Sequence, residues 1–152
     1  MTVPHVGSTA PDFTTKNQYG QDITLSALRG VPVVIVFYPF AFTRICTSEL
    51  AELRDSVAAF DESGARVLAI STDTMFTLRV FAEQERLGFD LLTDHWPHGQ
   101  IASSYGVFDD ELGCALRGTF VLDAHGTIVW SVVNSIGAAR TVSSVLAALP
   151  SA

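Results

Sequence analysis

The chain has 152 residues, 48% of them apolar, and a formal net charge of −7 at neutral pH. The length fits one domain around a single core, and the apolar content excludes a disordered chain. The negative charge argues against nucleic acid and an anionic membrane as partners, since both require a basic face on the protein. We therefore expect one domain over residues 1–152 that binds neither nucleic acid nor membrane.

The first segments alternate between strand and helix patterns. Two short apolar stretches, 13–15 and 23–25, flank a turn and predict a small hairpin. β-Branched and aromatic residues fill positions 33–38, which predicts a buried strand. Apolar residues then recur at helical spacing over 46–60, which predicts one helix with Glu49 on another face.

The second half of the chain continues this alternation. In chain order we expect a strand over 67–71, a helix over 77–87 with Val80 and Phe81 facing inward, a short strand at 91–92, a short helix over 99–105, strands at 107–108, 116–122 and 127–133, and a last helix whose inner face holds Val142, Val145, Leu146 and Leu149. This order predicts an α/β fold with a central mixed β-sheet, helices on both faces and an N-terminal β-hairpin.

Cys46 stands where the apolar strand ends and the helix begins. A cysteine at a helix N-terminus faces backbone N–H groups and the positive end of the helix dipole, and both favour a thiolate. Thr43 can hydrogen-bond the sulfur or a bound ligand, and Pro39 can close the pocket against water. These features predict a reactive Cys46. The alternatives are an inert buried cysteine, a plain helix cap at Thr43 and a strand terminator at Pro39.

The pattern Pro39-x-x-x-Thr43-x-x-Cys46 resembles the active-site signature of the peroxiredoxins. The resemblance extends over residues 5–150 and implies a thioredoxin-like fold with the N-terminal additions of that family. Further matching segments follow in the family's order: Gly7-Ser8-Thr9-Ala10-Pro11-Asp12-Phe13, Thr24-Leu25-Ser26-Ala27-Leu28-Arg29-Gly30, Leu92-Thr93-Asp94, Tyr105-Gly106-Val107 and Arg117-Gly118-Thr119-Phe120.

This resemblance implies a thiol-dependent peroxidase. The Cys46 thiolate would attack the outer oxygen of hydrogen peroxide or of an organic or lipid hydroperoxide, and would become a sulfenic acid. Arg117 matches the family's arginine that contacts the sulfur and the peroxide, and Glu49 matches a polar position that supports this arginine. The alternatives are a surface strand charge for Arg117 and a solvated helix face for Glu49.

Two loops narrow the resemblance within the family. Phe40-Ala41-Phe42-Thr43 and Asp94-His95-Trp96-Pro97-His98-Gly99 are most similar to the AhpE (alkyl hydroperoxide reductase E) type. That type implies a one-cysteine cycle, a homodimer or a higher oligomer, and no bound cofactor. It also implies an external thiol reductant such as mycothiol with a glutaredoxin-like partner, thioredoxin or another small thiol.

Cys114 is the second cysteine of the chain. Two-cysteine members of the family carry a resolving cysteine near the C-terminus or five residues after the reactive one, but no cysteine follows Cys114 and position 51 is Ala51. If a regular strand runs from Cys114 to Arg117, the odd spacing points these side chains to opposite faces and Cys114 away from Cys46. We therefore expect an ordinary buried cysteine, and a resolving cysteine is the alternative.

The N-terminal residues, the longest apolar run and the histidine spacing bear on the cellular compartment and on metal binding. Residues 1–7 lack the basic start and apolar core of a signal peptide, and the longest apolar run, 31–42, is shorter than the about 20 residues of a membrane span. We expect a cytoplasmic protein with reduced cysteines. His95 and His98 lie three residues apart without further ligands nearby in the sequence, so we expect no metal.

Two other functions remain open at this point. Thr43-Arg44-Ile45-Cys46 has the spacing of a Cys-x-x-Cys motif with oxygen in place of the first sulfur, so a thioredoxin-like dithiol–disulfide oxidoreductase is one alternative. A redox sensor or holdase, whose oxidised form binds a protein partner, is the other.

Overall fold

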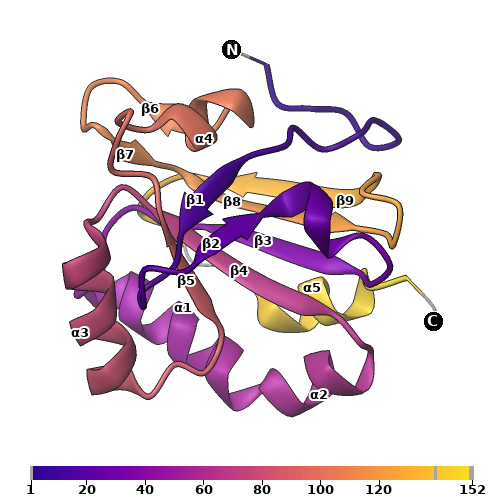
Figure 1. The fold of residues 1–152 in the computed structure, drawn as a ribbon, viewed down its shortest axis with the longest axis horizontal. Helices are drawn as coiled ribbons and strands as arrows, with labels where there is room; N and C mark the ends of the chain where they lie inside the picture. The colour runs from indigo at the N-terminus through magenta and orange to yellow at the C-terminus, as the bar shows by residue number, and fades with distance from the viewer. Residues whose placement is uncertain (1, 139, 151–152) are drawn as a thin grey trace.

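A central β-sheet organises the fold. A computed structural model describes residues 2–138 and 140–150, and within them five strands pair in the order β5-β4-β3-β8-β9 (Figure 1). The strands are β3 (Val33–Phe37), β4 (Arg66–Ser71), β5 (Asp90–Thr93), β8 (Arg117–Leu122) and β9 (Ile128–Asn134). Strands β3, β4 and β5 are parallel, whereas β8 pairs antiparallel with β3 and β9. The predicted central mixed sheet is confirmed.

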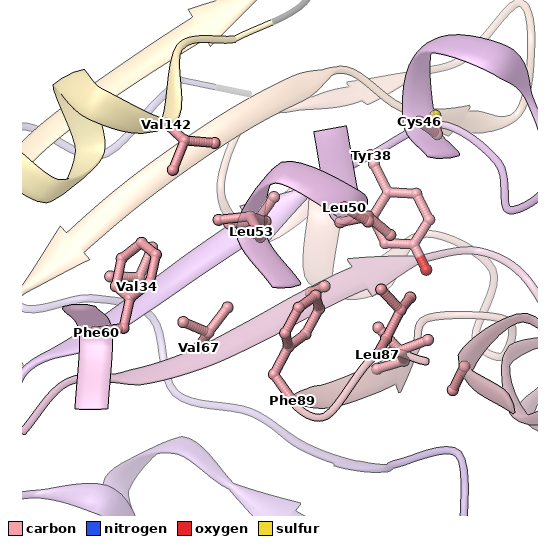
Figure 2. Packing of buried hydrophobic residues seen from close by; sticks show 14 of the residues in the cluster. Val34, Tyr38, Cys46, Leu50, Leu53, Phe60, Val67, Leu87, Phe89 and Val142 are labelled. Carbon is pink, nitrogen blue, oxygen red and sulfur yellow. The ribbon is translucent and has the colours of Figure 1, made fainter. Parts of the chain in front are cut away.

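Four helices cover one face of the sheet in the described residues. They are α1 (Arg44–Asp55), α2 (Val57–Glu62), α3 (Met75–Glu85) and α5 (Val142–Ala147), which lie together below the strands in Figure 1. Successive strand residues point to opposite faces, so alternate ones, such as Val34, face these helices. Figure 2 shows Val34 and Val67 of the sheet in one cluster with Leu53, Phe60 and Val142 of the helices.

The opposite face is covered by smaller elements. They are the antiparallel hairpin of β1 (Thr14–Lys16) and β2 (Asp22–Thr24), the short helix η1 (Leu25–Leu28), helix α4 (Gln100–Ser104), and a two-stranded sheet of β6 (Phe108–Asp109) and β7 (Cys114–Ala115). Tyr105, which follows α4, packs its ring on Phe120 of β8 at 5.0 Å between centroids. The predicted N-terminal hairpin and the helices on both faces are confirmed.

Two helix predictions are wrong in detail. The single helix expected over 46–60 is two helices, because Ser56 leaves the helical conformation at φ −101° and ψ 5°. The second helix brings Phe60 into the core, where it is 1% exposed. Val80 is exposed rather than inward, because Leu78 faces the core and residue 80 lies about 200° further round the helix.

No helix within the described ranges is long and apolar enough to cross a bilayer. Helix α1 has 12 residues, whereas a membrane span needs about 20 apolar ones.

Candidate active site

Cys46 lies in the first turn of α1, directly after the loop that leaves β3. It is fully buried, and Figure 2 shows it in one apolar cluster with Tyr38 and Leu50. Ala41 belongs to the same cluster. The first turn of a helix has no intrahelical partners for its N–H groups, so this position offers the sulfur backbone donors and the helix dipole. Burial raises the pKa of the Tyr38 phenol, so this wall of the site is neutral.

Pro39 and Thr43 bound the loop before Cys46. Pro39 is buried, and β3 ends two residues earlier, so this proline lies directly after the strand. Thr43 occupies the N-cap position with extended backbone, but its side chain makes no cap bond. Its hydroxyl instead donates to the carbonyl oxygen of Phe40 at 3.1 Å. The oxygen lone pairs of Thr43 therefore remain available to accept a hydrogen bond from a ligand.

Glu49 lies one turn after Cys46 on the same side of α1, because residues three apart share a helix face. It is 2% exposed, and its Oε1 accepts a hydrogen bond from Nη1 of Arg117, the first residue of β8. Arg117 is also 2% exposed, and its Nε donates to the carbonyl oxygen of Ile136 at 2.6 Å. The structure therefore brings the two predicted residues together, and the alternatives of a solvated helix face and a surface strand charge are wrong.

Arg140, just before α5, completes this cluster and is absent from the sequence predictions. Its backbone N–H and its Nε donate to Oε2 of Glu49 at 2.7 and 2.9 Å. Its Nη1 donates to the carbonyl oxygen of Gly118 at 3.1 Å and to Oγ1 of Thr119 at 2.9 Å, and its Nη2 donates to the carbonyl oxygen of Phe37. These bonds join the end of β3, the start of β8 and helix α1 around one guanidinium.

The cluster holds two arginines and one glutamate, so it carries one net positive charge in the protein interior. Burial lowers the pKa of Arg140, because desolvation disfavours its charged form, while Glu49 beside it acts in the opposite direction. Cys46 lies three residues before Glu49 on α1, which puts it on the same side of the helix as this cluster. Positive charge beside a cysteine favours its thiolate and can stabilise negative charge on a bound oxygen.

Cys114 does not lie on the regular strand that the spacing argument assumed. It is fully buried in β7, which pairs with β6, and Leu116 separates this strand from β8. Burial raises the pKa of the Cys114 thiol, and the negative charge of Asp109 adds to this while the positive charge of Arg117 opposes it. The inference that Cys114 points away from Cys46 therefore loses its premise. Both cysteines are free in the structure.

A raised thiol pKa predicts how Cys114 responds to pH. The fold favours the neutral thiol, so its contribution to stability is present below the ordinary pKa of 9.0 and is lost as pH rises through the raised value. At pH 8, we expect iodoacetamide to alkylate Cys114 about 100-fold more slowly in folded than in urea-unfolded protein. Peptide mass spectrometry measures both rates, and rates within threefold of each other would contradict this expectation.

His95 and His98 lie with their ring centroids 6.2 Å apart. Nε2 of His98 lies 2.7 Å from the carbonyl oxygen of Gly113, and its ring packs edge-on to Phe108. Among residues 2–138 and 140–150, no group of three or more His, Cys, Asp or Glu side chains is placed to hold a metal ion. His98 therefore links the loop after β5 to the turn before Cys114.

Comparison with known proteins places this site in a family. The model of the AhpC/TSA family matches residues 6–131, which include Cys46, Glu49 and Arg117. The chain belongs to the AhpC/TSA family. Alkyl hydroperoxide reductase E of Mycobacterium tuberculosis is 44% identical over 137 residues, which span 90% of each chain. Chloroplastic peroxiredoxin Q of Sedum lineare is 39% identical over 123 residues, which span 80% of this chain and 65% of that protein.

Solved structures of this family agree with the fold. The crystal structure of peroxidoxin BcpB from Mycobacterium tuberculosis has a TM-score of 0.84 and 34% identity, with 94% of each chain covered. Enterococcus faecalis AhpC has a TM-score of 0.88 at 23% identity and supports the fold alone, over 95% of this chain and 89% of that one. The predicted resemblance to peroxiredoxins of the AhpE type is confirmed, and the protein is a peroxidase enzyme of this family.

Proposed function

We propose that this protein reduces hydrogen peroxide and organic or lipid hydroperoxides through Cys46, in a one-cysteine cycle completed by an external thiol. The observation that carries the proposal is the buried cluster of Arg117, Glu49 and Arg140 beside the first turn of α1. Its net positive charge and the helix N-terminus together favour a thiolate at Cys46 and stabilise charge on departing oxygen.

The chemical step is a nucleophilic displacement. The Cys46 thiolate attacks the outer peroxide oxygen, the sulfur–oxygen bond forms and the oxygen–oxygen bond breaks. The departing oxygen takes a proton from solvent and leaves as an alcohol, or as water when the substrate is hydrogen peroxide. Cys46 becomes a sulfenic acid. Nη2 of Arg117 has no partner among the described residues, so it is the donor that we assign to the peroxide oxygens.

The loop residues support substrates larger than hydrogen peroxide. Phe40 and Phe42 are 39% and 47% exposed and flank buried Ala41 in the loop before Cys46. An apolar rim of this kind favours the alkyl part of a hydroperoxide by burying it from water. The peroxide group itself would contact Thr43 and Arg117. The apolar side chains of the loop would then determine how strongly large hydroperoxides are preferred over hydrogen peroxide.

Exposed apolar side chains also support self-association. Phe76 and Trp96 are 73% and 84% exposed beside a cleft of about 620 Å³ between the N-terminal hairpin and the start of α3. Large exposed apolar groups favour a protein interface. We therefore propose a homodimer, or a higher oligomer built from it.

The sulfenic acid must be reduced before the next cycle. We propose an external thiol for this step, namely mycothiol with a glutaredoxin-like partner, thioredoxin or another small thiol, and no bound cofactor. Two free cysteines suit a reducing compartment, so we place the reaction in the cytoplasm.

A two-cysteine cycle is the second candidate. Cys114 is a buried free thiol, and the sheet that holds it pairs Phe108 with Ala115 and Asp109 with Cys114. Such a short hairpin opens at low free-energy cost, which would release Cys114 to form a disulfide with oxidised Cys46.

The intact mass of the reduced protein after one equivalent of hydrogen peroxide tests the proposal. The expected result is the gain of one oxygen, located on Cys46 by peptide mapping. Loss of two hydrogens within a monomer would mean that Cys114 resolves the sulfenic acid. An unchanged mass with peroxide left over would contradict the peroxidase chemistry. Oxidation followed by capture of a protein partner, without multiple turnover, would favour the sensor or holdase.

A further inference from the structure

The loop that covers Cys46 is held by a side chain outside the cluster of Arg117, Glu49 and Arg140. Ala41 is buried in the same apolar cluster as Cys46, and its backbone N–H donates to Oδ2 of Asp73 at 2.8 Å. In the described part of the chain, it is the only hydrogen bond donated by a backbone N–H of residues 39–43.

The loop has a conformation that needs such a tether. Phe42 adopts φ +68°, a left-handed conformation that is costly for a residue other than glycine. Its ring packs on Phe81 of α3 at 5.0 Å between centroids. The aromatic contact holds the outer side of the loop, and the bond from Ala41 to Asp73 holds its buried side.

Asp73 is itself fixed to the sheet. It follows β4, and its Oδ2 also accepts a hydrogen bond from Oγ of Ser71 at 2.6 Å. Its carbonyl oxygen accepts a hydrogen bond from Oγ1 of Thr93, the last residue of β5, at 2.6 Å. Asp73 is therefore anchored to the end of β4 through its carboxylate and to the end of β5 through its backbone, and its bond to Ala41 links the loop to these strands.

We propose that Asp73 is a positioning residue of the peroxidase site, which acts by holding Ala41 so that the loop presents Thr43 and Pro39 correctly to a peroxide at Cys46. The proposal rests on the peroxidase function proposed above. The required property is an oxygen acceptor at this place rather than a negative charge, because a carboxylate near a thiolate is electrostatically unfavourable. The charge of Asp73 does reach this region, since it raises the pKa of both Tyr38 and Cys114.

Two variants separate the acceptor from the charge. Asp73→Ala removes the acceptor, and we expect the rate of Cys46 oxidation by peroxide to fall by about 10- to 100-fold, since small displacements of reacting groups have effects of this size. Asp73→Asn keeps an oxygen for the N–H of Ala41 and should restore the rate to within about threefold of wild type. Rapid quenching and intact mass give the rate in a single turnover.

Alkylation of Cys46 by iodoacetamide distinguishes positioning from general damage to the site. It reports thiolate reactivity and access without requiring peroxide geometry, so in Asp73→Ala it should be unchanged or faster. Asp90→Asn is the matched control, because Asp90 is also a partly buried carboxylate with hydrogen bonds, to Arg66 at 2.8 Å and Asn17 at 3.1 Å, but starts β5 at its other end. Its peroxide rate should equal that of wild type.

Each outcome decides the proposal. If wild type is oxidised by peroxide, three results would overturn the positioning role. They are an unchanged peroxide rate in Asp73→Ala, a loss of rate in Asp73→Asn equal to that in Asp73→Ala, and a fall in Cys46 alkylation that parallels the fall in peroxide rate. A wild-type protein that takes up no oxygen overturns the peroxidase function as well. A slow peroxide rate with normal alkylation, restored by Asp73→Asn, supports the proposal.

Discussion

Replacing Cys46 with serine is expected to abolish peroxide consumption, with a fall in turnover of at least about 10³-fold. The reason is chemical, because the attacking group must be a thiolate and a serine hydroxyl stays protonated in the same position. The rest of the site, including Arg117 and Glu49, remains in place and can bind peroxide without reacting. Peroxide loss in the presence of excess dithiothreitol is the measurement.

The matched control for this variant is Cys114→Ser. Both cysteines are fully buried, so both substitutions place a hydroxyl in an apolar site and should lower stability by a similar about 1–3 kcal/mol. Only Cys46 lies in the first turn of helix α1, so only its replacement should remove activity. Turnover of Cys46→Ser within tenfold of wild type would show that the reaction does not use this thiol.

The sequence predicts the parts of the site that lie close together in the chain. The apolar run before Pro39 and the helical pattern after Cys46 place the cysteine at a strand-to-helix junction, and the structure has β3 and α1 there. A local pattern carries this information because strand and helix periods are read within a few residues. The chemical roles of Thr43 and Arg117 remain predictions, since a structure fixes positions and not reactivity.

Arg140 could not be predicted in the same way, because its partners come from three distant segments of the chain. One signal is present, namely that Arg140 is the only Asp, Glu, Lys or Arg after Asp123. The side chain of a single cation in such an apolar stretch either lies on the surface or is buried and paired with an anionic side chain. Only the tertiary fold, which brings Glu49 of α1 beside the segment before α5, decides between the two.

The errors in the helices have the same origin. Hydrophobic spacing continues from Cys46 to Phe60, so the break at Ser56 has no counterpart in the pattern. For Cys114, the assumption of a regular strand failed because a two-residue strand pairs with β6 outside the main sheet. Periodicity reports which residues are apolar, and the packing of whole elements decides where each element stops.

Glu49→Gln is expected to have the second largest effect, on stability and activity together. The substitution keeps the shape of the side chain but leaves Arg117 and Arg140, both at most 5% exposed, as two buried cations without a counter-charge. Breaking a buried ion pair in this way costs about 3–5 kcal/mol of unfolding free energy. For a chain of this size, that corresponds to a fall in Tm of roughly 6–20 °C. Urea unfolding and calorimetry measure the two quantities.

At temperatures where Glu49→Gln remains folded, we still expect its activity to be lower than that of wild type. The amide of Gln has one acceptor oxygen where the carboxylate has two, so Arg117 and Arg140 cannot both keep their bonds to residue 49. The free donor of Arg117 then moves relative to the peroxide, and we expect an about 10- to 100-fold slower oxidation of Cys46. Glu52→Gln is the matched control, because Glu52 lies on the same helix but is exposed, and its loss should change stability by less than about 0.5 kcal/mol. Equal effects of the two substitutions would mean that the buried cluster neither stabilises the fold nor positions Arg117.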